Sequence, residues 1–200
     1  MILFNLKVFV SSPIKGLEAE RKAAKEALDI LGFRYFISEF DISSPVNCFN
    51  HCLSNVRDSD IFLLLLRDRY GWIPNNENYS ITELEFREAK KLKLPIFVFK
   101  MSGEIVELKQ KKFIKMVEDF DRGYFRGKVI DSPDELKERI IHNISNFLTR
   151  IFRQNVIGEE IKCPLCHGEG IISVKNKIIM CSKCGIDFVS GPIDGREKDE

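Results

Sequence analysis

The sequence predicts a doubly wound α/β domain with a five-stranded parallel sheet, followed by a small zinc-binding module. Three observations lead to this prediction. Apolar stretches of strand length alternate with amphipathic helical stretches along most of the chain, as in βαβ units. The stretch from Ile61 to Leu66 is apolar without alternation, which is typical of a strand covered on both faces. Two pairs of cysteines follow near the end of the chain.

The first half of the sheet is expected to begin with a strand at 7–10 and a helix at 15–31. Apolar residues in this helix recur at steps of three and four, and Gly32 is placed to end it. The next expected elements are a strand at 34–37, a helix at 47–57 and the buried strand at 60–66.

The second half is expected to follow a loop at 67–79. The last helix begins at Ser132, which with Pro133 and Glu135 has the signature of a capping box. Five strands joined by helices favour the flavodoxin-like order 2-1-3-4-5, in a domain spanning 1–153. The remaining expected elements are a helix at 81–93, a strand at 95–99, a helix at 106–120 and a fifth strand at 126–130.

The composition narrows the class of protein. Hydrophobic residues make up 44% of the chain, so a packed core can form, and the net charge is only +1. This balance gives no general attraction to nucleic acid or to an anionic membrane. No apolar run is long enough to span a bilayer, and the first residues do not form a signal peptide. We therefore expect a cytoplasmic protein, where six cysteines indicate metal binding rather than disulfides.

Two C-x2-C pairs, Cys163 with Cys166 and Cys181 with Cys184, predict a zinc ribbon at 158–190. Four thiolates complete a tetrahedral Zn²⁺ site and leave no open position, so the zinc is expected to be structural. The intervening segment is rich in β-prone residues and predicts a hairpin at 171–180. A redox pair or cysteines without metal are the alternatives. The balanced charge of the ribbon favours docking to a protein partner over nucleic acid, and a polar tail at 191–200 follows.

The helix after the buried strand carries the main candidate for chemistry. Ligands of doubly wound sheets bind beyond the carboxyl ends of the strands, where this helix begins. On a helical wheel Glu85 falls on the same face as the apolar Ile81 and Ala89. An inward carboxylate is costly unless it is paired or used, so Glu85 is the candidate catalytic residue. The alternative is a structural ion pair with one of three arginines, namely Arg57, Arg67 and Arg69.

The neighbouring glutamates have structural explanations. Glu83 points to the other side of the wheel and completes a capping box with Ser80. Glu88 lies on the inward face one turn deeper, where structural pairing is favoured. Cys48 and Cys52, one helical turn apart, are interpreted as small core residues.

Two loops at the same edge supply candidate binding residues. Ser11 and Ser12 follow the first strand, where hydroxyls and a helix N-terminus could meet a phosphate or ribose; a simple turn with a cap is the alternative. After the buried strand, Arg69 and Tyr70 offer charge for a phosphate and a ring for stacking; a loop anchored by buried aromatics is the alternative. Neither a Rossmann glycine motif nor a P-loop is present, and the three histidines do not favour a Ser-His-Asp triad.

Five short segments resemble the TIR-like domain of unknown function 4062 in their order along the chain. They are 8–12, 17–21, 56–62, 69–71 and 82–85, and the resemblance covers about residues 5–101. This family commonly stands at the head of bacterial signalling or defence proteins. The resemblance therefore implies a TIR-like fold and such a role, with the zinc ribbon lying outside it.

Two better-known groups resemble the same region. Nucleoside deoxyribosyltransferases have a T-x-x-E motif with a proline ten residues later, and Thr82, Glu85 and Pro95 keep this spacing. The NAD-cleaving TIR domains place a catalytic glutamate similarly. One departure is Ile81, which stands where the deoxyribosyltransferases usually have glycine.

The resemblance implies cleavage of an N-glycosidic bond in NAD⁺ or a related nucleotide. Glu85 would be catalytic, and the expected substrate-binding residues are Ser11, Ser12, Arg69, Tyr70 and Thr82. Because TIR-like sites are often completed by a neighbouring subunit, a homo-oligomer is also implied. The alternatives are a non-catalytic nucleotide sensor or adaptor, and, as the weakest, a nucleic-acid-binding factor.

Overall fold

The computed structural model describes residues 6–38, 48–119, 123–124, 127–156, 172–175, 178–181 and 187–189. The chain divides into two compact units. One is Leu6–Ile144, and the other is Ser145–Glu200 together with Met1–Asn5. Each unit is described by itself.

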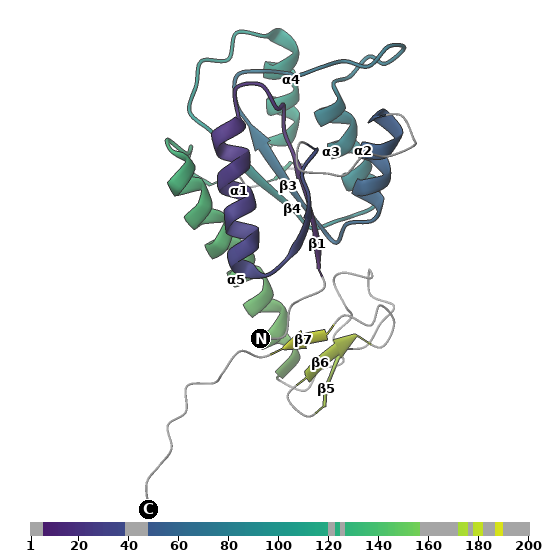
Figure 1. Ribbon diagram of the computed structural model, residues 1–200, viewed down its shortest axis with the longest axis vertical. Helices are drawn as coiled ribbons and strands as arrows, with labels where there is room; N and C mark the ends of the chain where they lie inside the picture. The colour runs from purple at the N-terminus through teal and green to yellow at the C-terminus, as the bar shows by residue number, and fades with distance from the viewer. Residues whose placement is uncertain are drawn as a thin grey trace, which may run out of the picture. The chain divides into compact units, whose positions relative to one another are not determined.

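The first unit is built on a four-stranded parallel sheet (Figure 1). Its strands are β1 (Lys7–Ser11), β2 (Arg34–Phe36), β3 (Ile61–Leu66) and β4 (Ile96–Lys100). They lie in the order β2-β1-β3-β4, which agrees with the predicted order for these four strands. In this register Val10 lies beside Leu63, and Leu63 lies beside Phe97.

The sheet is covered by helices on both faces (Figure 1). On one side lie α1 (Glu18–Leu31) and the first turns of α5 (Pro133–Val156), which are joined by an ion pair of 3.2 Å between Lys137 Nζ and Glu26 Oε2. On the other side lie α2 (Cys48–Arg57) and α3 (Ile81–Lys91). The helix α4 (Leu108–Val117) packs against α3 through Phe113 and Phe86, whose ring centroids are 5.6 Å apart. Two covered faces explain why every residue of β3 is buried.

The predicted helix ends are confirmed at three places. Gly32 ends α1 in the left-handed conformation, with φ at 71°. Ser80 caps α3, because its Oγ accepts from the Glu83 N–H at 3.3 Å. Ser132 accepts from the Glu135 N–H at 3.2 Å before α5. The carboxylate of Glu135 returns to the N–H of Asp131 at 3.0 Å.

The predicted fifth strand at 126–130 is wrong among the described residues. Only an isolated parallel bridge between Met101 and Ile130 continues the sheet beyond β4. The physical reason is Gly127, whose φ of 70° is incompatible with an extended strand. Among residues 127–132 the chain therefore reaches the sheet only at Ile130, before α5 begins.

The second unit contains a three-stranded antiparallel sheet in the order β5-β6-β7. Its strands are β5 (Ile172–Lys175), β6 (Ile178–Cys181) and β7 (Asp187–Val189). Lys175 pairs with Ile178, so the hairpin predicted at 171–180 is confirmed.

Three of the four predicted zinc ligands lie outside the residues that the structure describes. Cys181 is the last residue of β6, while Cys163, Cys166 and Cys184 lie outside the described residues, as does the tail at 191–200. Within the described part of the chain, no group of three or more His, Cys, Asp or Glu could hold a metal ion. The four-cysteine zinc site stays a prediction. None of the helices of the described residues is long and apolar enough to cross a membrane.

The buried central strand should dominate the stability of the first unit. Leu64 is completely buried in β3, so Leu64→Ala is expected to lower the free energy of unfolding by about 2–5 kcal/mol. Leu108→Ala removes the same atoms from an exposed position and should change it by about 0.5 kcal/mol or less. Urea unfolding followed by circular dichroism measures both. Equal losses in the two variants would contradict this assignment of the core.

Candidate functional site

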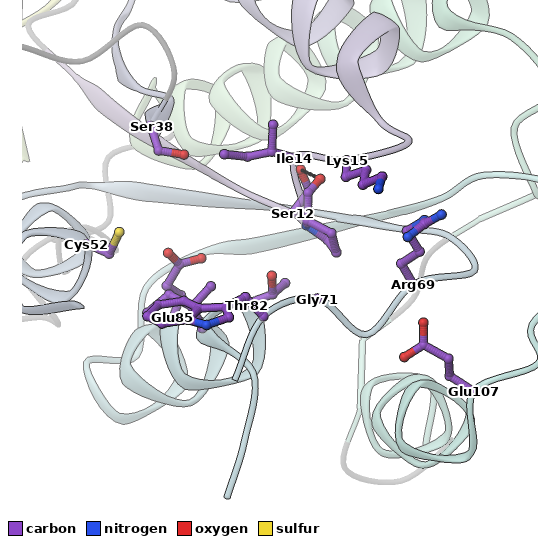
Figure 2. Close-up of a pocket in the computed structure, with 13 residues that line it drawn as sticks. Ser12, Ile14, Lys15, Ser38, Cys52, Arg69, Gly71, Thr82, Glu85 and Glu107 are labelled. Atoms are coloured by element: carbon purple, nitrogen blue, oxygen red, sulfur yellow. Dashed lines mark hydrogen bonds between the residues drawn. The ribbon is translucent and has the colours of Figure 1, made fainter. Parts of the chain in front are cut away.

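A cavity of about 540 Å³ opens at the carboxyl-terminal edge of the sheet (Figure 2). Its walls come from the loop after β1, the loop after β3 and the first turns of α3. This is the edge at which doubly wound folds bind their ligands. The residues contributed by these segments are Ser12, Pro13, Ile14 and Lys15, then Arg69, Gly71 and Trp72, then Ile81, Thr82 and Glu85. Ser38, Cys52 and Glu107 complete the lining.

Glu85 is buried at this cavity, with only 6% of its surface exposed. Its Oε2 accepts a hydrogen bond of 2.5 Å from the hydroxyl of Ser11, the last residue of β1. The helix places it there because α3 starts at the cap Ser80 and turns the Glu85 side chain towards the sheet. The inward direction predicted by the helical wheel is therefore confirmed.

Two of the three arginines considered as ion-pair partners for Glu85 are paired with other glutamates. Arg57 Nε lies 2.6 Å from Glu88 Oε1, and Arg67 Nη1 lies 2.9 Å from Glu20 Oε1. Arg69 is exposed and lines the cavity. The pairing of Glu88 agrees with the structural role predicted for it.

Burial raises the pKa of Glu85 to about 7, because the charged form loses its hydration. Three neighbours act in the opposite direction. They are the hydroxyl of Ser11, the positive charge of Arg21 and a hydrogen bond from Cys52. The carboxyl therefore exists in both its neutral and its ionised form near neutral pH, which is the condition that acid–base and charge-stabilising chemistry needs.

Arg21 is a site residue that the sequence reasoning missed. It is 1% exposed, and its Nη1 donates to Ser12 Oγ at 2.7 Å and to the Ser12 carbonyl at 3.3 Å. Its Nη2 donates to Ser38 Oγ at 3.1 Å. The signal was present in the sequence, since Arg21 follows Leu17 by four residues and precedes Ala24 by three on the apolar face of α1. The same wheel test that selected Glu85 would have found it.

The two predicted serines are held by the protein. Ser11 donates to Glu85, and it is not among the residues that line the cavity. Ser12 lines the cavity, but its hydroxyl donates to the Pro13 carbonyl at 3.0 Å and accepts from Arg21. The structure therefore gives both hydroxyls partners within the protein, and their contact with a substrate stays a prediction.

Tyr70 does not lie among the lining residues. Its hydroxyl donates to Glu83 Oε2 at 2.6 Å, and its ring packs edge-on against Phe113 with centroids 6.3 Å apart. Burial raises the pKa of Tyr70 to about 12, and the hydrogen bond to Glu83 acts in the same direction. Glu83 is itself buried and also accepts from Arg87 at 2.7 Å. Tyr70 thus anchors the loop after β3, which is the alternative that the sequence left open.

Thr82 lies one helical turn before Glu85 and lines the same cavity. It is 1% exposed, and among the described residues its Oγ1 has no hydrogen-bond partner. Gly71, with φ at 89°, lies beside it, and a Cβ there would stand 3.3 Å from Pro13 Cγ and 3.7 Å from Thr82 Oγ1. The glycine therefore leaves no side chain between the loop after β3 and the buried threonine hydroxyl.

The opposite end of the cavity is charged and more exposed. Figure 2 shows Lys15, Arg69 and Glu107 there, away from Glu85, Cys52 and Ser38. Ile14 and Trp72 line the cavity while their side chains remain largely open to solvent. The site therefore has a buried carboxyl at one end and two cations with one carboxylate at the other, and its lining also includes apolar residues, which suits a ligand with a hydroxylated part and an anionic part.

Residues 7–145 match the model of a protein family described as Domain of unknown function (DUF4062). The chain belongs to this family. The predicted resemblance to DUF4062 is confirmed, and the matched region contains all the described residues that line the cavity. A search of curated proteins found no match.

Three solved structures resemble the chain at low identity. A CMP N-glycosidase from Clostridium botulinum, BcmB, has 11% identity and a TM-score of 0.42, covering 67% of this chain and 97% of its own. A 2-desoxiribosyltransferase from Leishmania mexicana has 15% identity and a TM-score of 0.37, covering 64% and 81%. A flavone reductase has 13% identity and a TM-score of 0.37, covering 90% and 75%. At TM-scores below 0.5 these similarities carry no inference about the chemistry of this chain.

The raised pKa of Glu85 predicts a pH dependence of stability. The folded protein binds the Glu85 proton more tightly than the unfolded chain does, so this contribution is complete below about pH 4.5 and is lost as pH rises through about 7. Compared with Glu85→Gln, the wild type should lose roughly 1.4 kcal/mol of unfolding free energy per pH unit within that window. Urea unfolding of both proteins between pH 4.5 and 8 measures the difference.

The Glu88→Gln variant is the control for this measurement. Glu88 lies on the same helix but is paired with Arg57. The difference in unfolding free energy between the wild type and Glu88→Gln should therefore not show the same dependence on pH. A wild-type minus Glu85→Gln difference that is flat with pH would contradict the raised pKa.

Proposed function

We propose that this domain cleaves the N-glycosidic bond of a nucleotide, with Glu85 as the catalytic carboxylate and NAD⁺ as the first substrate to test. The observation that carries the proposal is a buried carboxyl of raised pKa at the wall of a cavity of about 540 Å³. Structural carboxylates are usually placed against a cation, as Glu88 and Glu20 are here. Glu85 instead stands next to space that a sugar can occupy.

In the proposed reaction the ribose lies against Glu85 and Thr82. The bond between C1′ and the base nitrogen breaks, and its electron pair leaves with the base. Positive charge then develops at C1′ in an oxocarbenium-like transition state. The ionised Glu85 stabilises that charge, and it does so strongly because the site is shielded from water. A water molecule adds its hydroxyl to C1′ and releases a proton, which completes the hydrolysis.

NAD⁺ fits a site with one carboxylate at the reacting end. Its nicotinamide is cationic while bound to the ribose and leaves as a neutral molecule, so no acid is needed to protonate it. The other carboxylate of the lining, Glu107, lies at the far end of the cavity with Lys15 and Arg69 (Figure 2). These two cations are placed to attract the phosphates. Trp72 offers an exposed ring on which a base can stack.

Glu85→Gln is expected to lower kcat for NAD⁺ by a factor of about 100 or more, because the neutral amide cannot balance the charge at C1′. Binding of NAD⁺ should be retained, since glutamine has the same shape. Release of nicotinamide measured by chromatography gives kcat, and calorimetry gives the dissociation constant. Glu88→Gln, one turn along the same helix, is the control and should keep activity within a few fold. Full turnover by Glu85→Gln would contradict the proposal.

The second candidate is a nucleotide sensor or adaptor without catalysis. It is favoured by Ser11 at the end of β1 and Ser12 after it, whose hydroxyls are already bonded to Glu85, Arg21 and Pro13 rather than free to position a reacting sugar. Tight NAD⁺ binding by the wild type without any nicotinamide release, unchanged in Glu85→Gln, would favour this function. In this function, occupancy of the cavity would depend on the nucleotide concentration, and the bound protein would pass the signal to a partner.

We further propose that the protein acts in the cytoplasm in bacterial signalling or defence, and that its first unit self-associates when active. Support for this comes from the TIR-like character of the motifs described above. The zinc ribbon is proposed to bind a protein partner, because its charge is balanced and four thiolates leave the metal no open position.

Zinc content tests the ribbon directly. The purified full chain is expected to contain about one zinc ion per molecule, and Cys181→Ser should lose most of it because a tetrahedral thiolate site needs all four ligands. Cys52→Ser is the control, since this cysteine lies in the first unit and should leave the zinc unchanged. Mass spectrometry of the metal content measures all three proteins. Equal zinc in Cys181→Ser and the wild type would contradict the four-cysteine site.

A further inference from the structure

Arg67 joins the loops that follow β1, β3 and β4 at the carboxyl-terminal edge of the sheet. It is the first residue after β3, and its Nη1 donates at 3.0 Å to the carbonyl of Gly16, in the loop after β1. Its Nε donates at 3.1 Å to the carbonyl of Ser102, in the loop after β4. The same Nη1 lies 2.9 Å from Oε1 of Glu20 in α1. One side chain therefore connects three loops and a helix.

These contacts depend on the shape of arginine and on close packing. A guanidinium carries its N–H donors in a rigid planar fork, so it can bond two carbonyls and a carboxylate at once, which the single nitrogen of lysine cannot match. Glu20 is buried, and the Arg67 carbonyl accepts at 2.9 Å from Nε2 of the buried Gln110 in α4. A Cβ on Gly103 would stand 3.4 Å from Arg67 Cγ, so the loop after β4 packs directly on the arginine.

The two cations of the cavity stand on the loops that Arg67 joins. Lys15 directly precedes Gly16, and Arg69 follows Arg67 by two residues. Gly16 has φ at 89°, and a Cβ on it would stand 3.5 Å from Arg69 Nε, so Arg69 lies against this turn. Arg67 itself is not among the residues that line the cavity. Its influence on a ligand is therefore exerted through Lys15 and Arg69.

We propose that Arg67 is a positioning residue, which holds Lys15 and Arg69 together and so makes the cavity selective for ligands that carry phosphate. Both cations are exposed side chains, and a fixed backbone beneath them lowers the cost of ordering them around an anion. Glu107, the carboxylate at the same end, accepts from the Tyr70 N–H at 3.3 Å. The meaning of this selectivity for a substrate rests on the proposed function, whereas binding can be measured without turnover.

The test is calorimetric titration of the full chain with ADP and with adenosine, which differ only in the phosphates. The wild type should bind ADP more tightly. Arg67→Met should weaken ADP by about tenfold and leave adenosine within about twofold, because the cations lose their support. Arg67→Lys keeps the charge beside Glu20 but not both carbonyl bonds, so its loss for ADP should be intermediate. No preference of the wild type for ADP, or equal losses for both ligands in Arg67→Met, would overturn the proposal.

Arg57→Met is the matched control, because it removes an arginine that is paired with Glu88 at 2.6 Å and does not line the cavity. It should leave the preference for ADP unchanged. A double-mutant cycle separates positioning from the charge of Arg67 itself: Lys15→Gln should weaken ADP clearly in the wild type and much less in Arg67→Met. Additive losses would overturn the proposal. If Arg67→Met does not fold, an ADP affinity of Arg67→Lys equal to that of the wild type would overturn it instead.

A kinetic measurement distinguishes this proposal from the proposed function. Arg67→Met should raise KM for NAD⁺ by about tenfold with little change in kcat, because the phosphates are bound alike before and during the reaction. Nicotinamide riboside, which lacks the phosphates, should be turned over equally by both proteins. The expected ADP results in a wild type that releases no nicotinamide would leave the positioning role intact and remove the glycosidase. Turnover of NAD⁺ with an ADP affinity that does not depend on Arg67 would do the reverse.

Discussion

The candidate site depends on burying one carboxyl at the end of β1. The Ser11 hydroxyl is 2.5 Å from Glu85 Oε2, and this bond together with Arg21 and Cys52 offsets part of the cost of removing the carboxylate from water. The offset is incomplete, because the pKa of Glu85 still rises to about 7. A fully compensated carboxylate would be a structural ion pair, and an uncompensated one would stay neutral. The intermediate value keeps both forms available at physiological pH.

The geometry of a β-strand explains how one short segment connects both sides of the sheet. Successive side chains point to opposite faces, so Ser11 reaches Glu85 on α3 while Ser12 reaches Arg21 on α1. Opposite charges are thereby placed above and below the end of β1, each bonded to one of two adjacent hydroxyls. Arg21 also fixes Ser38 after β2. The carboxyl, the guanidinium and the cavity wall are in this way held by the same central strand, which the parallel pairing with β2 and β3 makes rigid.

Much of this arrangement could be predicted from the sequence, because it follows from periodicity. The apolar run of β3, the ends of α1 and α3 and the inward direction of Glu85 all depend on local spacing. The sequence predicted a fifth strand that the described residues do not form, because the left-handed backbone of Gly127 cannot be recognised in an otherwise strand-like segment. Tyr70 was expected in the cavity, but its hydroxyl donates to Glu83 instead. This could not be predicted, because the course of a loop depends on tertiary contacts. The position of Cys52 in the cavity lining could not be predicted either, because it depends on how α2 packs beside α3, which residue spacing does not specify.

A carboxyl with a pKa near 7 also has a consequence for substrate choice. A positive charge next to Glu85 favours the ionised form of its carboxyl. A ligand that is cationic at the scissile bond therefore promotes the negative charge on Glu85 that cleavage of this bond requires. A neutral nucleoside gives no such assistance and additionally needs a proton for its leaving base. Among the described residues that line the cavity, the second carboxylate is Glu107, near Arg69 at the other end of the cavity. The burial of Glu85, the donors that limit its pKa and the separation of the two carboxylates therefore all favour a nucleotide whose base carries positive charge.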